Sequence, residues 1–112
     1  MRRALAVGLA ALAAGAAGAE PAPETDYALQ CRGCHGAEGA GVPGRVPGLA
    51  GVAALLETAE GRARLLAVPG VRQASLSDGR LAALLTWVAD RFAPPGAERA
   101  AALTAADVER LR

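Results

Sequence analysis

Five consecutive residues, Cys31-Arg32-Gly33-Cys34-His35, form a C-x-x-C-H motif in this chain of 112 residues. The chain has two cysteines and one histidine, and all three are in the motif. Two thiols three positions apart lie on one helical turn, where each can form a thioether with a haem vinyl group. The residue that follows places its imidazole against the iron. The motif therefore predicts a covalently attached haem, with Cys31 and Cys34 as anchors and His35 as an axial iron ligand.

Three other interpretations of the cysteine pair use less of the motif. A thioredoxin-like dithiol needs a βαβ setting, and the helical patterns of this sequence offer no strand. A structural zinc site normally needs four protein ligands, and the chain would have to borrow some from another chain. A disulfide between Cys31 and Cys34 would close a very short loop and stabilise little. None of the three gives a role to His35.

The first nineteen residues have the pattern of an export signal. Met1-Arg2-Arg3 is positively charged, residues 4–14 are an apolar run rich in Ala and Leu, and Ala17-Gly18-Ala19 matches a cleavage site before Glu20. The apolar run is short for a membrane span, which favours a cleaved signal. The alternative is that the segment is an uncleaved N-terminal anchor. We expect residues 1–19 to be a signal peptide and the mature chain to be periplasmic, with no membrane span.

Composition limits the remaining possibilities. The mature chain, residues 20–112, has the size of one small domain. The whole chain is 53% hydrophobic but 3% aromatic, so small side chains supply much of the hydrophobicity and a buried haem would have to complete the core. Twelve basic and eleven acidic residues give a balanced charge that does not favour nucleic-acid binding.

Apolar spacing and turn residues predict an all-α fold. Ser77 is a suitable N-cap for a helix that Pro94-Pro95-Gly96 stops after Phe92, and Thr104 is a possible N-cap for a terminal helix. We divide the mature chain into a domain at 20–96 and a C-terminal helical extension at 97–112. The expected segments are a helix at 25–31, a Gly-rich loop at 36–51, one broken helix or two short ones at 52–67, a loop at 71–73, and helices at 78–92 and 105–111.

From residue 27 to residue 92 the chain resembles the small class I bacterial cytochromes c. The resemblance depends on the C-x-x-C-H motif, on a P-x-L-x-G pattern beginning at Pro47, and on the helix pattern L-S-D-x-x-L-A-x-L-L-x-W at 76–87. It implies a cytochrome c fold, with three to five short helices around one covalently attached haem c. Pro47 lies twelve residues after His35, as does the family proline whose carbonyl accepts a hydrogen bond from the proximal histidine. The resemblance thus makes Pro47 a cofactor-binding residue that fixes the His35 ring.

The sequence departs from the family at the sixth iron ligand. The family usually supplies a methionine, but the chain has only Met1, and Val68-Pro69 stands at the expected place. Gln73 is the nearest neutral side chain with a donor atom and is our candidate distal ligand. Tyr27, a water, an empty position or a residue of a partner chain are the alternatives. Arg45 is a candidate partner for a haem propionate.

Two functional classes remain for a haem protein of this kind. The first is a non-catalytic electron carrier with redox partner proteins, such as a dehydrogenase donor and an oxidase or cytochrome acceptor. The second is a five-coordinate haem protein that binds small ligands, as a gas sensor or a weak peroxidase. A peroxidase would use a distal acid-base group, and the chain has no second histidine for that role. We expect the carrier, and not an enzyme. A structural module without haem is the third alternative.

Overall fold

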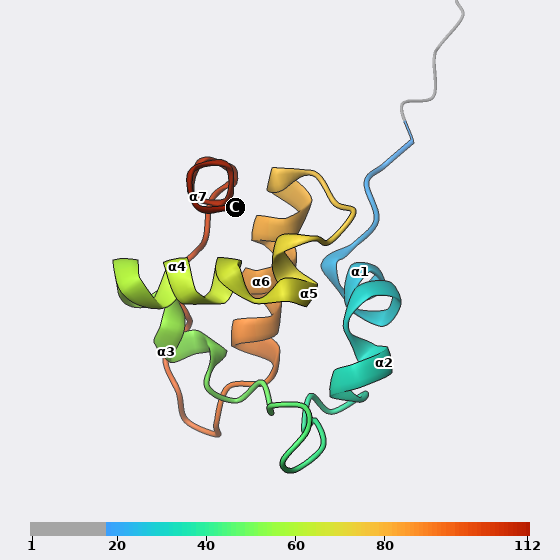
Figure 1. The fold of residues 1–112 in the computed structure, drawn as a ribbon, viewed down its shortest axis with the longest axis vertical. Helices are drawn as coiled ribbons and strands as arrows, with labels where there is room; N and C mark the ends of the chain where they lie inside the picture. Colours follow the sequence, from blue (N-terminus) through green and yellow to red (C-terminus); the bar gives the residue numbers. More distant parts are fainter. Residues whose placement is uncertain (1–17) are drawn as a thin grey trace, which may run out of the picture.

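The computed structural model describes residues 18–112, so the predicted signal peptide lies outside the described residues except for its last two positions. The described chain is all helical, without a strand, which confirms the predicted fold class (Figure 1). It has seven helices where three to five were expected, because two of them are single turns of four residues. The helices are α1 Pro23–Gln30, α2 Arg32–His35, α3 Val52–Leu56, α4 Ala59–Ala67, α5 Pro69–Arg72, α6 Asp78–Arg91 and α7 Ala105–Leu111.

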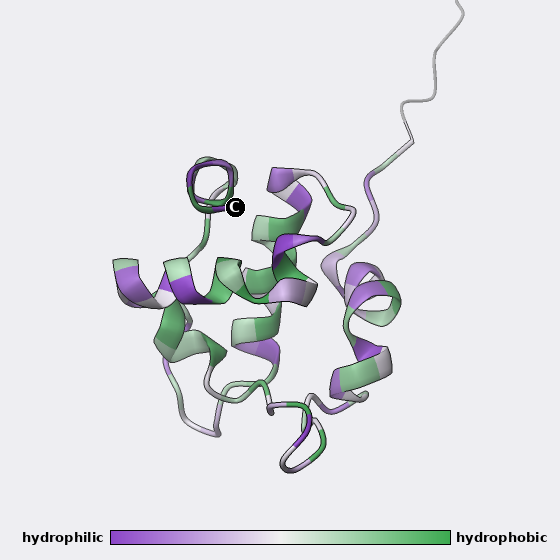
Figure 2. Cartoon of the chain, in the orientation of Figure 1, coloured by the Kyte–Doolittle hydropathy of each residue, from purple (hydrophilic) through white to green (hydrophobic). Residues whose placement is uncertain are grey.

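Helix α6 is the centre of the fold and packs against α1, α3 and α7 (Figure 1). The Ser77 hydroxyl accepts a hydrogen bond from the Arg80 amide at 3.2 Å, so the predicted N-cap is present. Figure 2 shows hydrophobic residues concentrated along the middle of α6 and on α3. The buried side of α6 carries apolar residues at the i, i+3, i+4 and i+7 spacing of one helix face: Leu81, Leu84, Leu85 and Val88.

Residues 52–67 form two short helices, α3 and α4, and the break lies at Thr58. The Thr58 hydroxyl caps α4 by accepting a hydrogen bond from the Gly61 amide at 3.0 Å. Gly61, the one glycine of this segment, does not interrupt it, because it lies inside α4 and is buried. A Cβ atom at Gly61 would collide with the backbone of Leu55, so the residue is needed for close packing of α4 on α3.

The segment after α4 corrects another expectation. Residues 71–73 were expected to be loop, but α5 begins at Pro69 and includes Val71 and Arg72, with Gln73 as its C-cap. Proline favours the first position of a helix, where its missing N–H costs nothing and its fixed φ is already suitable. The proline that ends α4 thus starts the next helical turn.

Residues 97–112 pack on the domain rather than extending from it. Helix α7 has the predicted bounds and contacts α4 and α6. Thr104 and Asp107 form a capping box, in which each side chain accepts a hydrogen bond from the other residue's amide. The Val108 side chain is fully buried, and the Arg112 guanidinium reaches Asp78 at 2.7 Å. The C-terminal helix is therefore part of the single core.

Helix α1 crosses α6 through an aromatic cluster and an ion pair. The Tyr27 ring lies 5.5 Å from the Trp87 ring and 5.1 Å from the Phe92 ring, measured between centroids. The Asp26 carboxylate is 2% exposed and accepts two hydrogen bonds from the Arg80 guanidinium. These contacts fix the helix that leads into the C-x-x-C-H motif. No helix within residues 18–112 has the length and apolarity needed to cross a membrane.

Candidate functional site

Helix α2 brings the three motif side chains onto one helical turn, as the sequence predicted. Cys31 lies at the junction of α1 and α2, and its carbonyl accepts hydrogen bonds from the amides of Cys34 at 3.2 Å and His35 at 3.0 Å. The two thiols are not joined in a disulfide. Burial, and then the Asp26 carboxylate, raise the pKa of the Cys31 thiol above its ordinary value.

The predicted contact between His35 and Pro47 is present. The Nδ1 atom of His35 lies 2.9 Å from the carbonyl oxygen of Pro47. A carbonyl oxygen only accepts hydrogen bonds, so Nδ1 must donate and carry the proton. In a neutral imidazole the other nitrogen, Nε2, then keeps its lone pair and is free to bind a metal. Pro47 therefore selects the tautomer and the orientation that an axial ligand requires.

Gly41 leaves room for the carbonyls of Val46 and Pro47 to approach it, a role that sequence reasoning did not assign. The Gly41 amide donates to the carbonyl of His35 at 2.9 Å, and a Cβ atom at residue 41 would stand 2.6 Å from the Pro47 oxygen. Gly41 also has a φ angle of +66°, a backbone conformation that residues with a Cβ atom rarely adopt. The loop can therefore close back on His35 only if residue 41 is glycine. The one signal in the sequence was the density of glycines in this loop.

Two apolar cavities meet beside His35 and share the side chains of Val68 and Val71. One has a volume of about 200 Å³ and the other about 350 Å³, which together are in the range of cavities that hold small molecules and cofactors. The first is lined by Gln30, Cys31, Cys34, His35, Val68, Gly70, Val71, Ala74, Leu81, Leu84 and Leu85. The second is lined by His35, Pro47, Gly48, Leu49, Gly51, Val52, Leu55, Leu65, Val68 and Val71.

The chemistry of these linings fits a haem attached through the motif. Cys31, Cys34 and His35 line the same cavity, so both thiols and the imidazole are available to one group. The other lining residues are hydrocarbon or glycine apart from Gln30, as a buried porphyrin ring would require. Val68 is 45% exposed, which leaves one edge of the cavities open to solvent.

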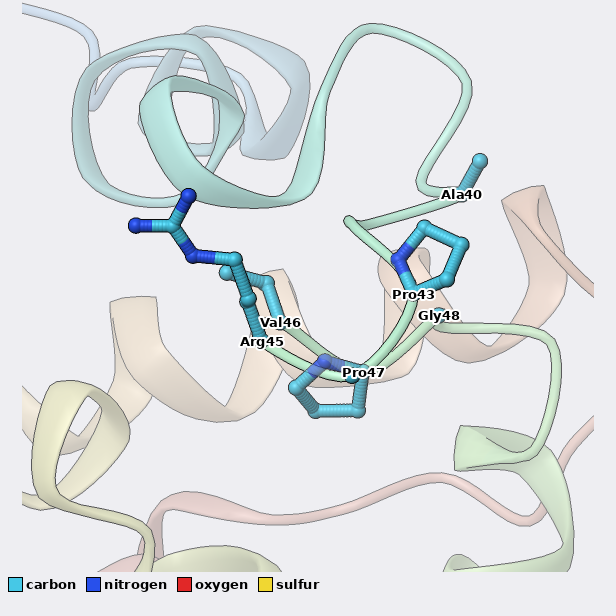
Figure 3. Close-up of a pocket in the computed structure, with 7 residues that line it drawn as sticks. Ala40, Pro43, Arg45, Val46, Pro47 and Gly48 are labelled. Carbon is cyan, nitrogen blue, oxygen red and sulfur yellow. The ribbon is translucent and has the colours of Figure 1, made fainter.

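Three other residues considered from the sequence line neither cavity. Gln73 is exposed at the end of α5 and lines neither cavity, so the structure does not support it as the distal ligand. Tyr27 is buried and donates its hydroxyl to the Gly36 carbonyl, which gives it a structural role. Arg45 is exposed on the loop and lines another hollow, of about 400 Å³, which shares Pro47 and Gly48 with the larger cavity. Its guanidinium points away from Pro43 and Pro47 (Figure 3).

The structure also bears on the competing interpretations of the cysteines. Over residues 18–112 the only extended pairing is an isolated bridge between Val42 and Val46, so the βαβ setting of a thioredoxin-like site is absent there. Within the same residues, no three His, Cys, Asp or Glu side chains come together as metal ligands. A zinc site formed by this part of the chain alone is therefore not supported.

Comparison of the chain with protein-family models gave no match. Comparison with curated proteins gave no match either.

Proposed function

We propose that this chain is an exported, mono-haem c-type cytochrome domain that transfers electrons. The observation that carries the proposal is the hydrogen bond between His35 and Pro47, formed beside an apolar cavity that both cysteines also line. Two thiols and an imidazole on one helical turn suit one covalently bound haem, and the tautomer of His35 leaves Nε2 free for its iron.

The three motif residues have separate roles in this proposal. Cys31 and Cys34 would hold the haem through thioethers, which would prevent its loss even where the site is open to solvent. His35 would bind the iron through Nε2, because Nδ1 donates to the Pro47 carbonyl. This hydrogen bond makes the imidazole more basic, which would favour the ferric state and lower the potential. The bound haem would supply a one-electron couple of iron.

The exposed edge of the cavities favours an electron carrier over an enzyme. Val68 is half exposed and Cys34 is exposed, so a redox partner can approach the cofactor edge closely. Apart from the motif residues Cys31, Cys34 and His35, none of the residues that line the two cavities is an acid or a base that would move protons in a reaction. The partners are then redox proteins, a dehydrogenase that donates electrons and an oxidase or cytochrome that accepts them.

Production of the full chain in a bacterium with a haem-attachment system tests the proposal. We expect a haem that stays bound to the polypeptide on denaturing gels, a mature chain that starts at Glu20, and reversible reduction by small redox dyes. Replacing both cysteines by alanine should abolish covalent haem. Arg32→Ala and Gly33→Ala, at the two variable positions of the motif, are matched controls that should retain it. A wild-type chain that is exported and processed but carries no covalent haem would contradict the proposal.

A further inference from the structure

The cavities beside His35 have a second wall, which comes from the segment around α5. Val68 and Val71 are common to both cavities. Helices α2 and α5 are not in contact, so the helix that ends at His35 and this wall lie on different sides of the cavities. A flat group that takes His35 on one face would therefore have its other face toward Val68 and Val71.

This wall has no side chain that can bind a metal or donate a hydrogen bond. The Val71 and Ala74 amides are occupied, since they donate to the carbonyls of Val68 and Val71 at 2.9 and 3.2 Å. Apart from the three motif residues, the only polar side chain that lines either cavity is that of Gln30, which belongs to α1 and neighbours Cys31. From residue 68 onward, the residues lining the smaller cavity are Val68, Gly70, Val71, Ala74, Leu81, Leu84 and Leu85.

We propose that this wall makes the second axial position a binding site for small neutral ligands of ferrous iron, namely carbon monoxide and nitric oxide. The inference rests on the proposed haem attachment and adds a ligand to it. With no protein donor on the wall, the position is left to an external molecule. A neutral diatomic ligand loses little hydration on entering a hydrocarbon cavity, whereas an anion loses its hydration without a hydrogen bond from the side chains of the wall in return. The site thus selects neutral ligands over anions.

Val68 is the place where a ligand enters. It is 45% exposed while it lines both cavities, so it stands between solvent and the space next to His35. A substitution at residue 68 therefore changes the wall without opening the core. Val42 offers a matched control, because it is 44% exposed and lines neither cavity.

The first experiment is a titration of the haem-loaded, chemically reduced protein with carbon monoxide, followed by optical spectroscopy. We expect saturable binding to the wild-type protein. Val68→Met places a thioether on the wall, and it should weaken carbon monoxide binding by at least about tenfold through competition for the iron. Val42→Met should bind the gas as the wild-type protein does. Equal affinities for all three proteins would contradict the assignment of the wall.

A second experiment tests the preference for neutral ligands. Val68→Thr keeps the shape of the side chain and adds one hydroxyl that can donate a hydrogen bond. In the oxidised protein it should strengthen azide binding several-fold over the wild type, with little effect on carbon monoxide binding to the reduced protein. Val42→Thr is the control. If wild-type ferric protein binds azide as tightly as Val68→Thr does, the wall does not select against anions.

The outcomes separate this inference from the proposed function. A protein without covalent haem defeats the proposed function itself. A covalently bound haem whose reduced spectrum does not change with carbon monoxide leaves the carrier intact and overturns the inference. If Gln30→Ala then restores gas binding, Gln30 occupies the second face in the wild-type protein.

Discussion

Gly41 and Pro47 are packed so closely that a Cβ atom at residue 41 would stand 2.6 Å from the Pro47 carbonyl oxygen. The same oxygen accepts the hydrogen bond from His35 Nδ1 at 2.9 Å. The acceptor for the histidine can therefore lie where it does only because residue 41 has no side chain.

Gly41→Ala should displace the Pro47 carbonyl and weaken its hydrogen bond to His35. A weaker bond makes the imidazole less basic, so the midpoint potential of the haem-loaded protein should rise. The free energy of unfolding should fall by about 1–2 kcal/mol from the left-handed backbone alone, and further from the clash. Potentiometric titration and urea unfolding of the same preparation measure both effects.

Gly44→Ala is the matched control for that experiment. Gly44 also has a positive φ, of +73°, but a Cβ atom there meets nothing within 4 Å. Gly44→Ala should lower the free energy of unfolding through the same left-handed backbone conformation, and it should leave the midpoint potential unchanged. An equal shift of potential in both variants would show that Gly41 acts through loop strain and not through the Pro47 carbonyl.

The ion pair between α1 and α6 should respond unequally to removal of its two members. Arg80→Met leaves the Asp26 carboxylate, 2% exposed, without its partner. Asp26→Ala leaves only a guanidinium, which is 27% exposed and reaches water. We therefore expect Arg80→Met to lower Tm by several degrees and by more than Asp26→Ala does.

Arg99→Met provides the reference for a surface pair. The Arg99 side chain is 90% exposed and lies 3.4 Å from Asp90. Its replacement should change the free energy of unfolding by less than about 0.5 kcal/mol. If Arg80→Met lowers the free energy of unfolding by as little as Arg99→Met does, the Asp26 carboxylate is not buried in solution.

Helix α7 should contribute to the stability of the whole domain. Val108 is fully buried between α7 and its neighbours, so Val108→Ala should lower the free energy of unfolding by roughly 1.5–3 kcal/mol. Val42→Ala, at an exposed position, should change it by less than about 0.5 kcal/mol. Urea unfolding followed by circular dichroism compares the two. A small effect at Val108 would mean that residues 97–112 detach from the domain without loss of its core.

The features that the sequence predicted well depend on neighbouring residues. Ser77 and Thr104 cap helices because a hydroxyl just before an apolar periodic segment satisfies the first free amides, whatever the rest of the fold does. The motif likewise needs only one helical turn to bring Cys31, Cys34 and His35 together. The position of Pro47 came from the resemblance to a family, since no local rule relates two residues twelve positions apart.

The features that the sequence did not predict depend on contacts between distant segments. The role of Gly41 follows from its packing against Pro47, and the role of Gly61 follows from the approach of α4 to α3. Gln73 was selected as a distal candidate because it was expected in a loop near the iron. Once Pro69 starts a helical turn, Gln73 lies at its exposed end, and only the three-dimensional structure shows this.

The free energy of unfolding should fall at acid pH as the Asp107 carboxylate becomes protonated. Hydrogen bonds from the Thr104 amide and hydroxyl, and then from Arg110, lower the pKa of Asp107 to about 2. An unfolded aspartate has a pKa of about 3.9, so the folded state binds the proton less tightly. The stabilisation by Asp107 is therefore complete above about pH 4 and is lost as the pH falls toward 2.

Asp107→Asn should reduce the dependence of the free energy of unfolding on pH between about pH 4 and pH 2, because the amide does not titrate. Thr104→Ala should also reduce the pH dependence and lower the stability at neutral pH by about 1 kcal/mol through loss of the N-cap. Glu109→Gln, which removes a carboxylate from an exposed position of the same helix, is the control. Urea unfolding from pH 5 to pH 2 measures all three variants. If Asp107→Asn and the wild-type protein lose stability in parallel over that range, the capping box at α7 does not account for the acid sensitivity.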